Sequence, residues 1–405
     1  MLIDMLRLAA RNLLRNRRRT AVTLGGLVLG VAAALLLQGF VAGMLGFVGA
    51  ALVDARTGAI QIHKTGHLQA DNKALDFALQ QDAELERRIL AVPGVVALAP
   101  RLTFEGTIGN GEQSTMALVT AVAPTREALV CTNRFTGVVG RGLSADGAAE
   151  GVLGLKLAIG LRTGVGGDLQ LLATAKSGQP NLLDLKMTGR APSLTEMDAR
   201  RLVMIPLGFA QQLLDMPGQI TEYAVAVEHR DEADVIAARL RLALGPQYEV
   251  MTWLDLMPQL RSLIGMLRGV MRGVVGVLLI LLTTAVANTM WMSVHERVRE
   301  IGTMMALGSR RQWILRLLVA EAAVLGLVGT TAGSLLGSVV LGVLGSRGLT
   351  FSAPGADIPS MLYPHVSVAT VAITAVVVLA ATLVAAAGPA WRASKLTPVE
   401  CLRAT

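Results

Sequence analysis

Long apolar stretches alternate with polar segments along this chain of 405 residues. Four stretches contain no Asp, Glu, Lys or Arg: residues 21–53, 273–294, 322–346 and 366–391. Each can cross the hydrocarbon core of a bilayer as a helix, which takes about 20 residues. The first stretch has 33 residues. At about 1.5 Å per residue it would reach about 50 Å, so we expect it to continue beyond the membrane as a stalk.

The segment between the first two stretches, residues 54–272, alternates short helical and strand-like patterns of apolar residues, as a folded domain does. Helical patterns at 82–90 and 231–244 are each followed by a turn and a strand-like run. We therefore expect an α+β domain with two lobes, and an apolar helical stripe that indicates a second stalk. The predicted parts are lobe A at about 54–124 and 220–253, lobe B at about 125–219, and the second stalk at 254–272.

A charged segment, residues 295–316, separates the second stretch from the third. Val294, Val298, Ile301 and Met305 recur at spacings of four, three and four, which places them on one face of a helix. Gly308 fits a helix end, because glycine adopts the left-handed conformation at little cost. The pattern predicts a short helix within 295–310 and a new helix over 311–346. The alternative is an ordinary charged loop.

Composition and charge place these segments relative to a membrane. Hydrophobic residues make up 53% of the chain, charged residues 16%, and the mean hydropathy is +0.55, which indicates a membrane protein. Three flanks carry net charges of +5, +3 and +2, namely 1–20, 295–316 and 392–405, whereas the whole chain carries +8. The basic excess therefore lies on one side, as the positive-inside rule requires of cytoplasmic flanks. This charge argues for topology and against a nucleic-acid partner.

The predicted fold is thus an α-helical membrane protein with four transmembrane helices and an inserted extracytoplasmic α+β domain. Both termini and the 295–310 helix are expected in the cytoplasm, with the domain and an outer loop at 347–365 on the other side. Transmembrane helices are expected at 21–53, 273–294, 311–346 and 366–391, followed by a cytoplasmic tail at 392–405.

Several residues near the membrane stand out by type and spacing. Arg7, Arg11 and Arg15 recur every four residues opposite an apolar face, which is typical of a helix lying in the membrane interface. Glu321 and Asn288 are polar groups in or next to spans, and we expect a nearby arginine to pair with Glu321. The small-xxx-small spacing predicts close helix packing at Gly26, Gly30, Gly329, Gly333 and Gly337.

The sequence offers no catalytic constellation. No lysine follows a glycine, so the phosphate-binding loop of many ATPases is missing, and no cofactor site of this chain is predicted. His63 and His67 are four apart in a strand-like stretch, which favours a solvated loop over a metal site. Cys131 and Cys401 fall on opposite sides of the membrane and cannot pair. We predict no catalytic and no metal-binding residue, and leave the roles of His63, His67 and Cys131 open.

Three motifs resemble those of ABC transporter permeases of the MacB/FtsX/LolCE type. The first is Arg11-Asn12-Leu13-Leu14-Arg15-Asn16, which is similar to the N-terminal elbow helix of that family. The second is the tail, Pro389-Ala390-Trp391-Arg392-Ala393 with Pro398-Val399-Glu400 and Leu402-Arg403. The third is the coupling segment, with Glu296, Arg297, Arg299, Glu300, Ile301, Gly302, Ala306, Gly308, Arg311 and Ile314. The resemblance covers the whole chain, because one span, a large outer domain and three further spans are the family layout.

The resemblance implies a function and partners. It implies a permease subunit in a bacterial inner membrane that works with a cytoplasmic ABC ATPase dimer, which binds ATP and Mg, and with a second permease copy or a paralogue. It implies that Glu296, Arg297, Arg299, Glu300, Ile301, Gly302 and Gly308 couple the chain to that ATPase. Lipoprotein release, with lipoprotein cargo and a periplasmic acceptor, ranks first by layout. Export of a periplasmic peptide, toxin or drug ranks second, and an FtsX-like signal relay to cell-wall hydrolases ranks third.

Overall fold

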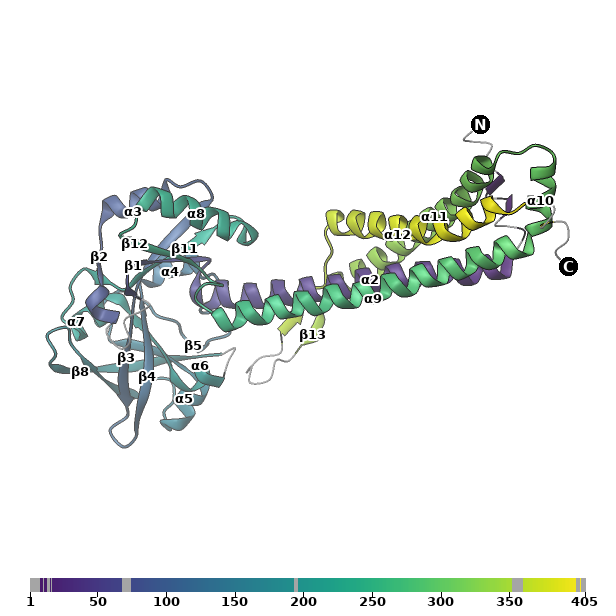
Figure 1. The fold of residues 1–405 in the computed structure, drawn as a ribbon. Helices are drawn as coiled ribbons and strands as arrows, with labels where there is room; N and C mark the ends of the chain where they lie inside the picture. The colour runs from purple at the N-terminus through teal and green to yellow at the C-terminus, as the bar shows by residue number, and fades with distance from the viewer. Residues whose placement is uncertain are drawn as a thin grey trace. The chain divides into compact units, whose positions relative to one another are not determined.

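The computed structural model describes the chain apart from residues 1–7, 10, 13, 14, 16, 68–73, 193–195, 352–359, 398–400 and 402–405. The chain forms two compact units. The membrane unit comprises Met1–Leu45, Ile264–Leu349 and Leu362–Thr405, and the domain unit comprises Gly46–Leu263 and Thr350–Met361. Figure 1 shows the helices of the first unit and the mixed sheet of the second.

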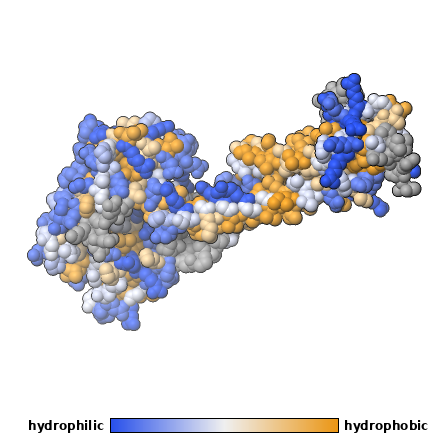
Figure 2. Space-filling view, in the orientation of Figure 1, coloured by the Kyte–Doolittle hydropathy of each residue, from blue (hydrophilic) through white to orange (hydrophobic). Residues whose placement is uncertain are grey.

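Four helices in the described part of the chain are long and apolar enough to cross a membrane. They are α2 (Arg17–Leu52), α9 (Pro258–Glu296), α11 (Arg311–Arg347) and α12 (Val368–Lys395). The four predicted spans are therefore present, and each helix extends beyond its uncharged stretch at the end or ends that lie toward the basic flanks. Figure 2 shows apolar side chains gathered over these helices, whereas the domain surface is mostly hydrophilic.

Glycines bring α11 close to α2 in the membrane unit. A Cβ added to Gly333 would lie 2.8 Å from the Val28 carbonyl oxygen, and one on Gly329 would lie 2.8 Å from the Leu27 Cβ. Gly337 faces α2 one turn further on, and Gly30 faces a leucine of α9. A Cβ on Gly26 would meet no atom within 4 Å. The predicted packing role therefore holds for the other four glycines and fails for Gly26 within this chain.

Short elements complete the membrane unit and the outer loop. The helix α10 (Val298–Ala306) lies between α9 and α11, and residues 8, 9, 11, 12 and 15 are helical ahead of α2. In the predicted outer loop, β13 (Leu349–Phe351) pairs with β14 (Ser360–Leu362).

A 10-stranded sheet forms the centre of the domain unit. Its order is β12-β1-β11-β3-β4-β9-β6-β8-β5, and β7 pairs with β3 and β8 off this path. The strands at one end are β12 (Tyr248–Thr252), β1 (Ile60–Lys64), β11 (Glu222–Val227), β3 (Val95–Gly109) and β4 (Ser114–Val122). Those at the other are β9 (Leu202–Pro206), β6 (Glu150–Gly154), β8 (Pro180–Ala191), β5 (Val139–Gly140) and β7 (Asp168–Thr174).

This strand order keeps the two predicted lobes apart but does not separate them into two sheets. The strands of lobe A occupy one end and those of lobe B the other. They are joined by the parallel pair β4–β9, with Val119 opposite Val203, and by the antiparallel pair β3–β7, with Thr107 opposite Leu172. The chain enters lobe B and leaves it through neighbouring strands, so one continuous core serves both lobes.

Helices cover the sheet where apolar residues recur at helical spacing. At the lobe A end, α3 (Ala83–Leu90) and α8 (Ala233–Leu244) pack against each other and against the sheet, as Figure 1 shows. Their buried Ile89, Ile236 and Leu240 join the main core. The remaining elements are α4 (Pro124–Val130), α5 (Leu155–Gly160), α6 (Glu196–Arg201), α7 (Leu207–Leu213), the 3-10 turns Ala74–Phe77 and Arg230–Glu232, and the pair β2 (Leu79–Gln80) and β10 (Gln219–Ile220).

Candidate functional site

The helix α10 has the predicted amphipathic form. Val294 and Ile301 are buried in the core of the membrane unit, and Met305 packs against that core. Gly308 adopts a φ of +93°, which confirms the predicted left-handed helix end. The amides of Gly308 and Ser309 donate to the carbonyl groups of Met305 and Met304, each at 3.0 Å, and α11 begins at Arg311. The charged segment is therefore an ordered helix–turn–helix unit.

Arg297, at the junction of α9 and α10, ties these helices to α11. Its Nη1 donates to Glu321 Oε1 at 2.8 Å, and its Nε donates to Glu300 Oε2 at 3.0 Å. Glu321 is only 2% exposed and also accepts from Asn12 Nδ2 at 2.6 Å. Burial would lower the pKa of Arg297, but Glu321 and Glu300 together raise it above its ordinary value. Glu321 thus has the arginine partner that its position suggests, and its role here is to hold three helical segments together.

Glu300 binds the N-terminal segment. Arg15 Nη2 donates to Glu300 Oε1 at 2.5 Å, which joins residues 285 positions apart. Burial would raise the pKa of Glu300, but the hydrogen bonds from Arg297 and Arg15 hold it below its ordinary value. Glu300 is therefore ionised at neutral pH and engaged within its own chain.

One face of the N-terminal helical segment makes a series of polar contacts. Asn12, Arg15, Arg19 and Thr23 are spaced by three, four and four residues, which places them on one helical face. Arg19 Nη2 donates to the Thr289 carbonyl oxygen at 2.5 Å, and Arg19 Nη1 lies 3.3 Å from Glu296 Oε1. The hydroxyl groups of Thr23 and Thr289 are 2.8 Å apart. This face therefore binds the cytoplasm-proximal ends predicted for α9, α10 and α11.

The sequence singled out three arginines and one asparagine near this face. Arg15 pairs with Glu300 while its side chain remains 57% exposed, Arg11 is exposed, and Arg7 lies outside the described residues, so the interfacial position of these arginines stays a prediction. The side chain of Asn288 is exposed, and its backbone carbonyl, not its amide, accepts from Arg19 at 3.4 Å. The neighbouring Thr289 makes the hydroxyl contact with Thr23.

Gly302 packs against the C-terminal segment. A Cβ on Gly302 would lie 2.4 Å from the Cβ of Cys401, which is fully buried. The amide of Cys401 donates to the Thr397 carbonyl at 3.0 Å. Only a residue without a side chain allows this approach, so Gly302 has a packing role on the inner side of α10.

The outer side of α10 is a stripe of exposed residues. Arg299, Thr303, Ala306 and Leu307 follow at spacings of four, three and one, and all four are exposed. Leu307 is 88% exposed, which is unusual for a leucine at the end of an ordered helix. Among the predicted coupling residues, Arg299 and Gly308 are on or next to this stripe. Glu296, Arg297, Glu300, Ile301 and Gly302 instead make contacts within the chain, and Ile301 and Gly302 are buried, so any part they have in coupling stays a prediction and would act through the packing of α10.

Local patterns did not identify several residues of this site. Asn12, Arg19 and Cys401 were not singled out for their contacts, and neither was Leu307 for its exposure. Their signal in the sequence is weak. The spacing of Asn12, Arg15 and Arg19 defines a polar face, but nothing local indicates which carboxylates that face meets.

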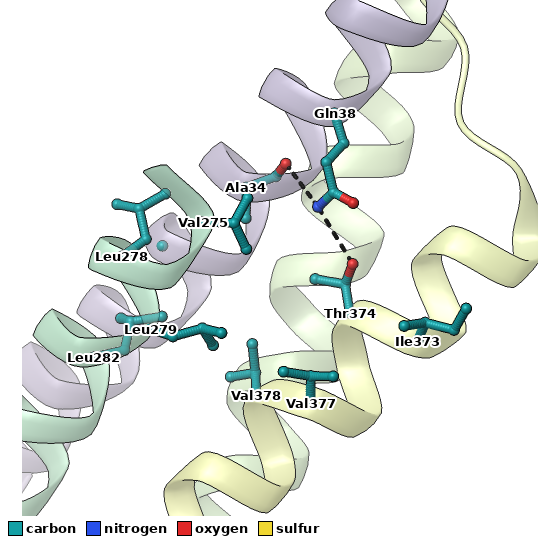
Figure 3. Close-up of a pocket in the computed structure, with 11 residues that line it drawn as sticks. Ala34, Gln38, Val275, Leu278, Leu279, Leu282, Ile373, Thr374, Val377 and Val378 are labelled. Carbon is teal, nitrogen blue, oxygen red and sulfur yellow. Dashed lines mark hydrogen bonds between the residues drawn. The ribbon is translucent and has the colours of Figure 1, made fainter. Parts of the chain in front are cut away.

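A second feature of the membrane unit is an apolar cavity of about 130 Å³ between α2, α9 and α12. Figure 3 shows Leu279, Leu282 and Val378 along its walls, with Gln38 at one end. Gln38 Nε2 donates to the Ala34 carbonyl at 3.1 Å and to Thr374 Oγ1 at 3.4 Å. The lining suits apolar groups, and Gln38 supplies one amide.

The domain unit offers no metal cluster among the residues the structure describes. His63 and His67 stack with ring centroids 4.6 Å apart, and His63 Nε2 lies 3.2 Å from Gln61 Oε1. Stacked rings present their faces to each other, and this arrangement does not direct both imidazole nitrogens at one ion.

Four spanning helices, a helix–turn–helix segment braced from inside and a mixed-sheet domain inserted after the first span define a membrane permease. Residues 20–243 match the MacB-like periplasmic core domain family, and residues 272–398 match the FtsX-like permease C-terminal family. The chain belongs to the ABC transporter permeases of the MacB/FtsX/LolC type.

Individual relatives agree with this assignment. The chain is 32% identical over 200 residues to the ABC transporter permease YvrN of Bacillus subtilis, covering 47% of this chain and 45% of YvrN. It is 24% identical over 330 residues to the lipoprotein-releasing system protein LolC of Xylella fastidiosa, covering 77% of this chain and 78% of LolC. It is 24% identical to the macrolide export protein MacB of Bdellovibrio bacteriovorus, covering 99% of this chain and 62% of MacB.

Among solved structures, the extracellular domain of the transporter YknZ aligns with a TM-score of 0.32 and 14% identity, covering 48% of this chain and all of that domain. Family membership implies a partner ABC ATPase and an assembly of more than one permease subunit.

Proposed function

We propose that the outer stripe of α10 (Arg299, Thr303, Ala306 and Leu307) is the surface on which the partner ATPase docks. The observation that carries this proposal is the division of α10 into two faces. Its inner face is held by Arg297, Glu321, Glu300 and Cys401, so the helix is rigid against its own unit. The outer face presents the guanidinium group of Arg299, the hydroxyl group of Thr303 and the side chain of Leu307, which is 88% exposed. A rigid helix with an exposed apolar anchor and a nearby charge suits a protein partner.

The orientation follows from charge. The three basic flanks would share the cytoplasm, where the ATPase binds ATP and Mg, and the domain unit would lie on the opposite side. In this scheme the partner hydrolyses ATP, and the resulting movement of the ATPase is transmitted through this chain to its domain.

We propose that the cargo is a lipoprotein, which the transporter releases from the inner membrane. The match to LolC supports it, because it extends over 77% of this chain and 78% of LolC. A second permease copy or a paralogue would complete the assembly, and a periplasmic acceptor would receive the lipoprotein.

Export of a periplasmic compound is the second candidate. It is favoured by the match to MacB over 99% of this chain and by the family assigned to residues 20–243. The two candidates differ in cargo, whereas the docking surface is the same.

Docking is tested by crosslinking, with the chain purified from its native membranes together with its ATPase. We expect Leu307→Cys to crosslink to the ATPase through a short reagent that carries a photoreactive group on the cysteine and therefore needs no particular residue on the partner. Leu242→Cys is the matched control, because Leu242 is 87% exposed but lies in the domain. A Leu307→Cys variant that fails to crosslink while the complex hydrolyses ATP would contradict the docking surface.

Cargo is tested in vesicles reconstituted with the chain and its ATPase. We expect ATP to release an acylated lipoprotein from the vesicles into solution when a soluble acceptor is present. ATP-dependent movement of a macrolide without lipoprotein release would favour the export candidate.

A further inference from the structure

The last turn of the first spanning helix is bound into the domain unit through its backbone. The helix α2 ends at Leu52 and continues as one wide π-helical turn, Val53–Thr57, before Gly58. Asn133 N donates to the Asp54 carbonyl at 3.0 Å, and Cys131 Sγ donates to the Val53 carbonyl at 3.2 Å. These donors come from the segment that follows α4, so a distant part of the chain caps this helix end.

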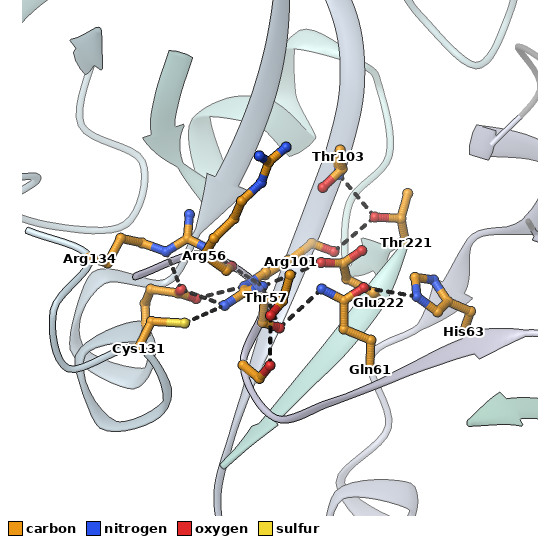
Figure 4. A network of polar contacts seen from close by, with 12 residues as sticks. Arg56, Thr57, Gln61, His63, Arg101, Thr103, Cys131, Arg134, Thr221 and Glu222 are labelled. Atoms are coloured by element: carbon orange, nitrogen blue, oxygen red, sulfur yellow. Dashed lines mark hydrogen bonds and ion pairs between the residues drawn. The ribbon is translucent and has the colours of Figure 1, made fainter. Parts of the chain in front are cut away.

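Two buried arginines bind the next carbonyl groups of the same turn. Arg101 Nη1 donates to the carbonyl oxygens of Arg56 at 2.9 Å and Thr57 at 3.2 Å, and Arg134 Nη2 also donates to the Arg56 carbonyl. Figure 4 shows both guanidinium groups converging on this turn. Cations at the carboxyl end of a helix complement its exposed carbonyl groups and the negative end of its dipole.

Carboxylates fix the two arginines in place. Arg101 Nε and Nη2 donate to the two carboxylate oxygens of Glu127 at 3.0 and 2.7 Å, and Arg134 Nε lies 2.5 Å from Glu127 Oε1. Arg101 is 1% exposed, Glu127 is fully buried, and Glu222 Oε1 lies 3.6 Å from Arg101 Nη1. Burial would raise the pKa of Glu127, but the two arginines hold it below its ordinary value. The carboxylate of Glu127 therefore stays ionised between the two arginines.

Surface ion pairs hold the same turn from outside. Asp54 pairs with Arg230 at 2.6 Å, and Arg56 pairs with Asp198 at 2.5 Å. Moving this turn against the sheet would thus expose buried, unpaired charges and break bonds to several elements. Apolar residues of similar size often stabilise a fold as well as a buried ionic cluster does. A buried ionic cluster, however, fixes one arrangement of the groups that it binds.

We propose that Arg101 and Arg134 are positioning residues that hold the last turn of α2 fixed on the sheet, so that movement of α2 reaches the domain without being absorbed at the helix end. This inference rests on the proposed function, in which the ATPase moves the domain. The guanidinium groups act through the backbone of Val53–Thr57 and touch no cargo. Arg134 is the better residue to remove, because Glu127 keeps both bonds from Arg101.

The experiment measures hydrogen exchange in the chain reconstituted with its ATPase in lipid nanodiscs, with and without ATP and vanadate. The variants are Arg134→Met, the milder Cys131→Ala, and Arg141→Met as control, because the 59% exposed Arg141 pairs with Glu150 away from this turn. Cys131→Ala removes one bond to the turn and leaves all four charges in place, so it keeps the test valid if Arg134→Met fails to fold.

We expect amide exchange over residues 53–58 to rise at least about tenfold in Arg134→Met, less in Cys131→Ala, and not at all in Arg141→Met. Nucleotide should still change exchange over 298–306 in every variant, since that segment faces the ATPase. The nucleotide-dependent change over 124–131 in the domain should be present in the wild type and Arg141→Met, reduced in Cys131→Ala, and lost in Arg134→Met.

Two results would overturn the role of these arginines: unchanged exchange over 53–58 in both Arg134→Met and Cys131→Ala, or a loosened turn with a domain that still responds fully to nucleotide. A third result concerns the wild type. If nucleotide does not change hydrogen exchange in its domain although the complex hydrolyses ATP, the proposed function is refuted, and the positioning role falls with it.

Discussion

Cys401 packs against Gly302 so closely that a methyl group on Gly302 would lie 2.4 Å from the Cys401 Cβ. The C-terminal segment therefore supports the inner side of α10, just as Arg15 supports it from the N-terminal side. Residues from near both termini, Arg15 and Cys401, therefore brace α10.

Gly302→Val should displace the C-terminal segment. Overpacking of a tight contact costs about 1–3 kcal/mol, and a β-branched side chain has no other direction in which to fit. We expect the buried Cys401 thiol to become reactive toward maleimide in open membranes of a Cys131→Ala background. Gly276→Ala is the control, since a Cβ there meets nothing within 4 Å. Equal labelling of Cys401 in the Gly302→Val and control proteins would contradict this contact.

Gly333→Ala should destabilise the packing of α2 on α11, whereas Gly26→Ala should not. A Cβ on Gly333 would lie 2.8 Å from both the Val28 carbonyl oxygen and the Val31 Cβ, while Gly26 faces open space. The expected cost at Gly333 is about 1–3 kcal/mol, because the closest atoms include backbone that cannot rotate away. Thermal unfolding of the purified proteins in detergent measures the difference. A larger loss for Gly26→Ala would show that its open side is a contact with another subunit.

Replacing Arg297 alone should lower the stability of the chain more than replacing both Arg297 and its partner Glu321. Arg297→Met leaves the 2% exposed Glu321 without its cation, which costs about 3–5 kcal/mol for a buried pair. Glu321→Gln in the same protein removes the stranded charge and should recover most of the loss, because Asn12 can still bind the amide. Yield and thermal stability in detergent report both changes. Additive losses in the double variant would mean that the two side chains do not interact.

The sequence alone could predict the spans, α10 and the turn at Gly308, because these follow from local periodicity and backbone preference. Val294, Val298, Ile301 and Met305 show their shared face at helical spacing without any knowledge of the fold. The sequence alone could not predict which charged side chains of α10 form ion pairs within the chain and which remain exposed. Arg299 and Glu300 are adjacent charged residues of one short helix, and the pairing of Glu300 with Arg15, 285 positions away, leaves no local signal.

The domain illustrates the same limit. The helix–strand echo at 82–98 and 231–252 predicts lobe A, and the strands of these segments lie together at one end of the sheet. The parallel pairing of β4 with β9, which merges the lobes into one sheet, joins segments about 80 residues apart and leaves no local signal. The buried Arg101–Glu127 pair was missed for the same reason, because a charged residue in a strand pattern usually indicates a solvated position.

Acidification should weaken the segment around β6 through Glu150. Burial would raise the pKa of Glu150, but hydrogen bonds from Ser144 and Arg141 hold it below its ordinary value of 4.5. A group with a lowered folded-state pKa contributes stability that is complete above the unfolded value and is lost as pH falls through the folded value. The stability difference between wild type and Glu150→Gln should therefore be constant near neutral pH and shrink below pH 4.5.

Thermal unfolding of the purified chain from about pH 7 to about pH 3.5 checks this linkage. Glu112→Gln, at an exposed position in the β3–β4 turn, controls for the loss of one negative charge. A Glu150→Gln difference that grows on acidification would reverse the sign of the argument.

The two faces of α10 should respond differently to charge reversal. Arg299→Glu and Leu307→Asp change only exposed side chains, so the stability of the chain should remain within about 0.5 kcal/mol of wild type. Binding of the ATPase should weaken, because a charge-assisted hydrogen bond contributes about 1.5–3 kcal/mol. Glu300→Lys should instead lower stability, since it repels both Arg15 and Arg297 in its own chain. Thermal unfolding of the chain alone and ATP hydrolysis by the reconstituted complex separate these effects. Wild-type hydrolysis and cargo release by both outer-face variants would show that the stripe is an ordinary solvated surface.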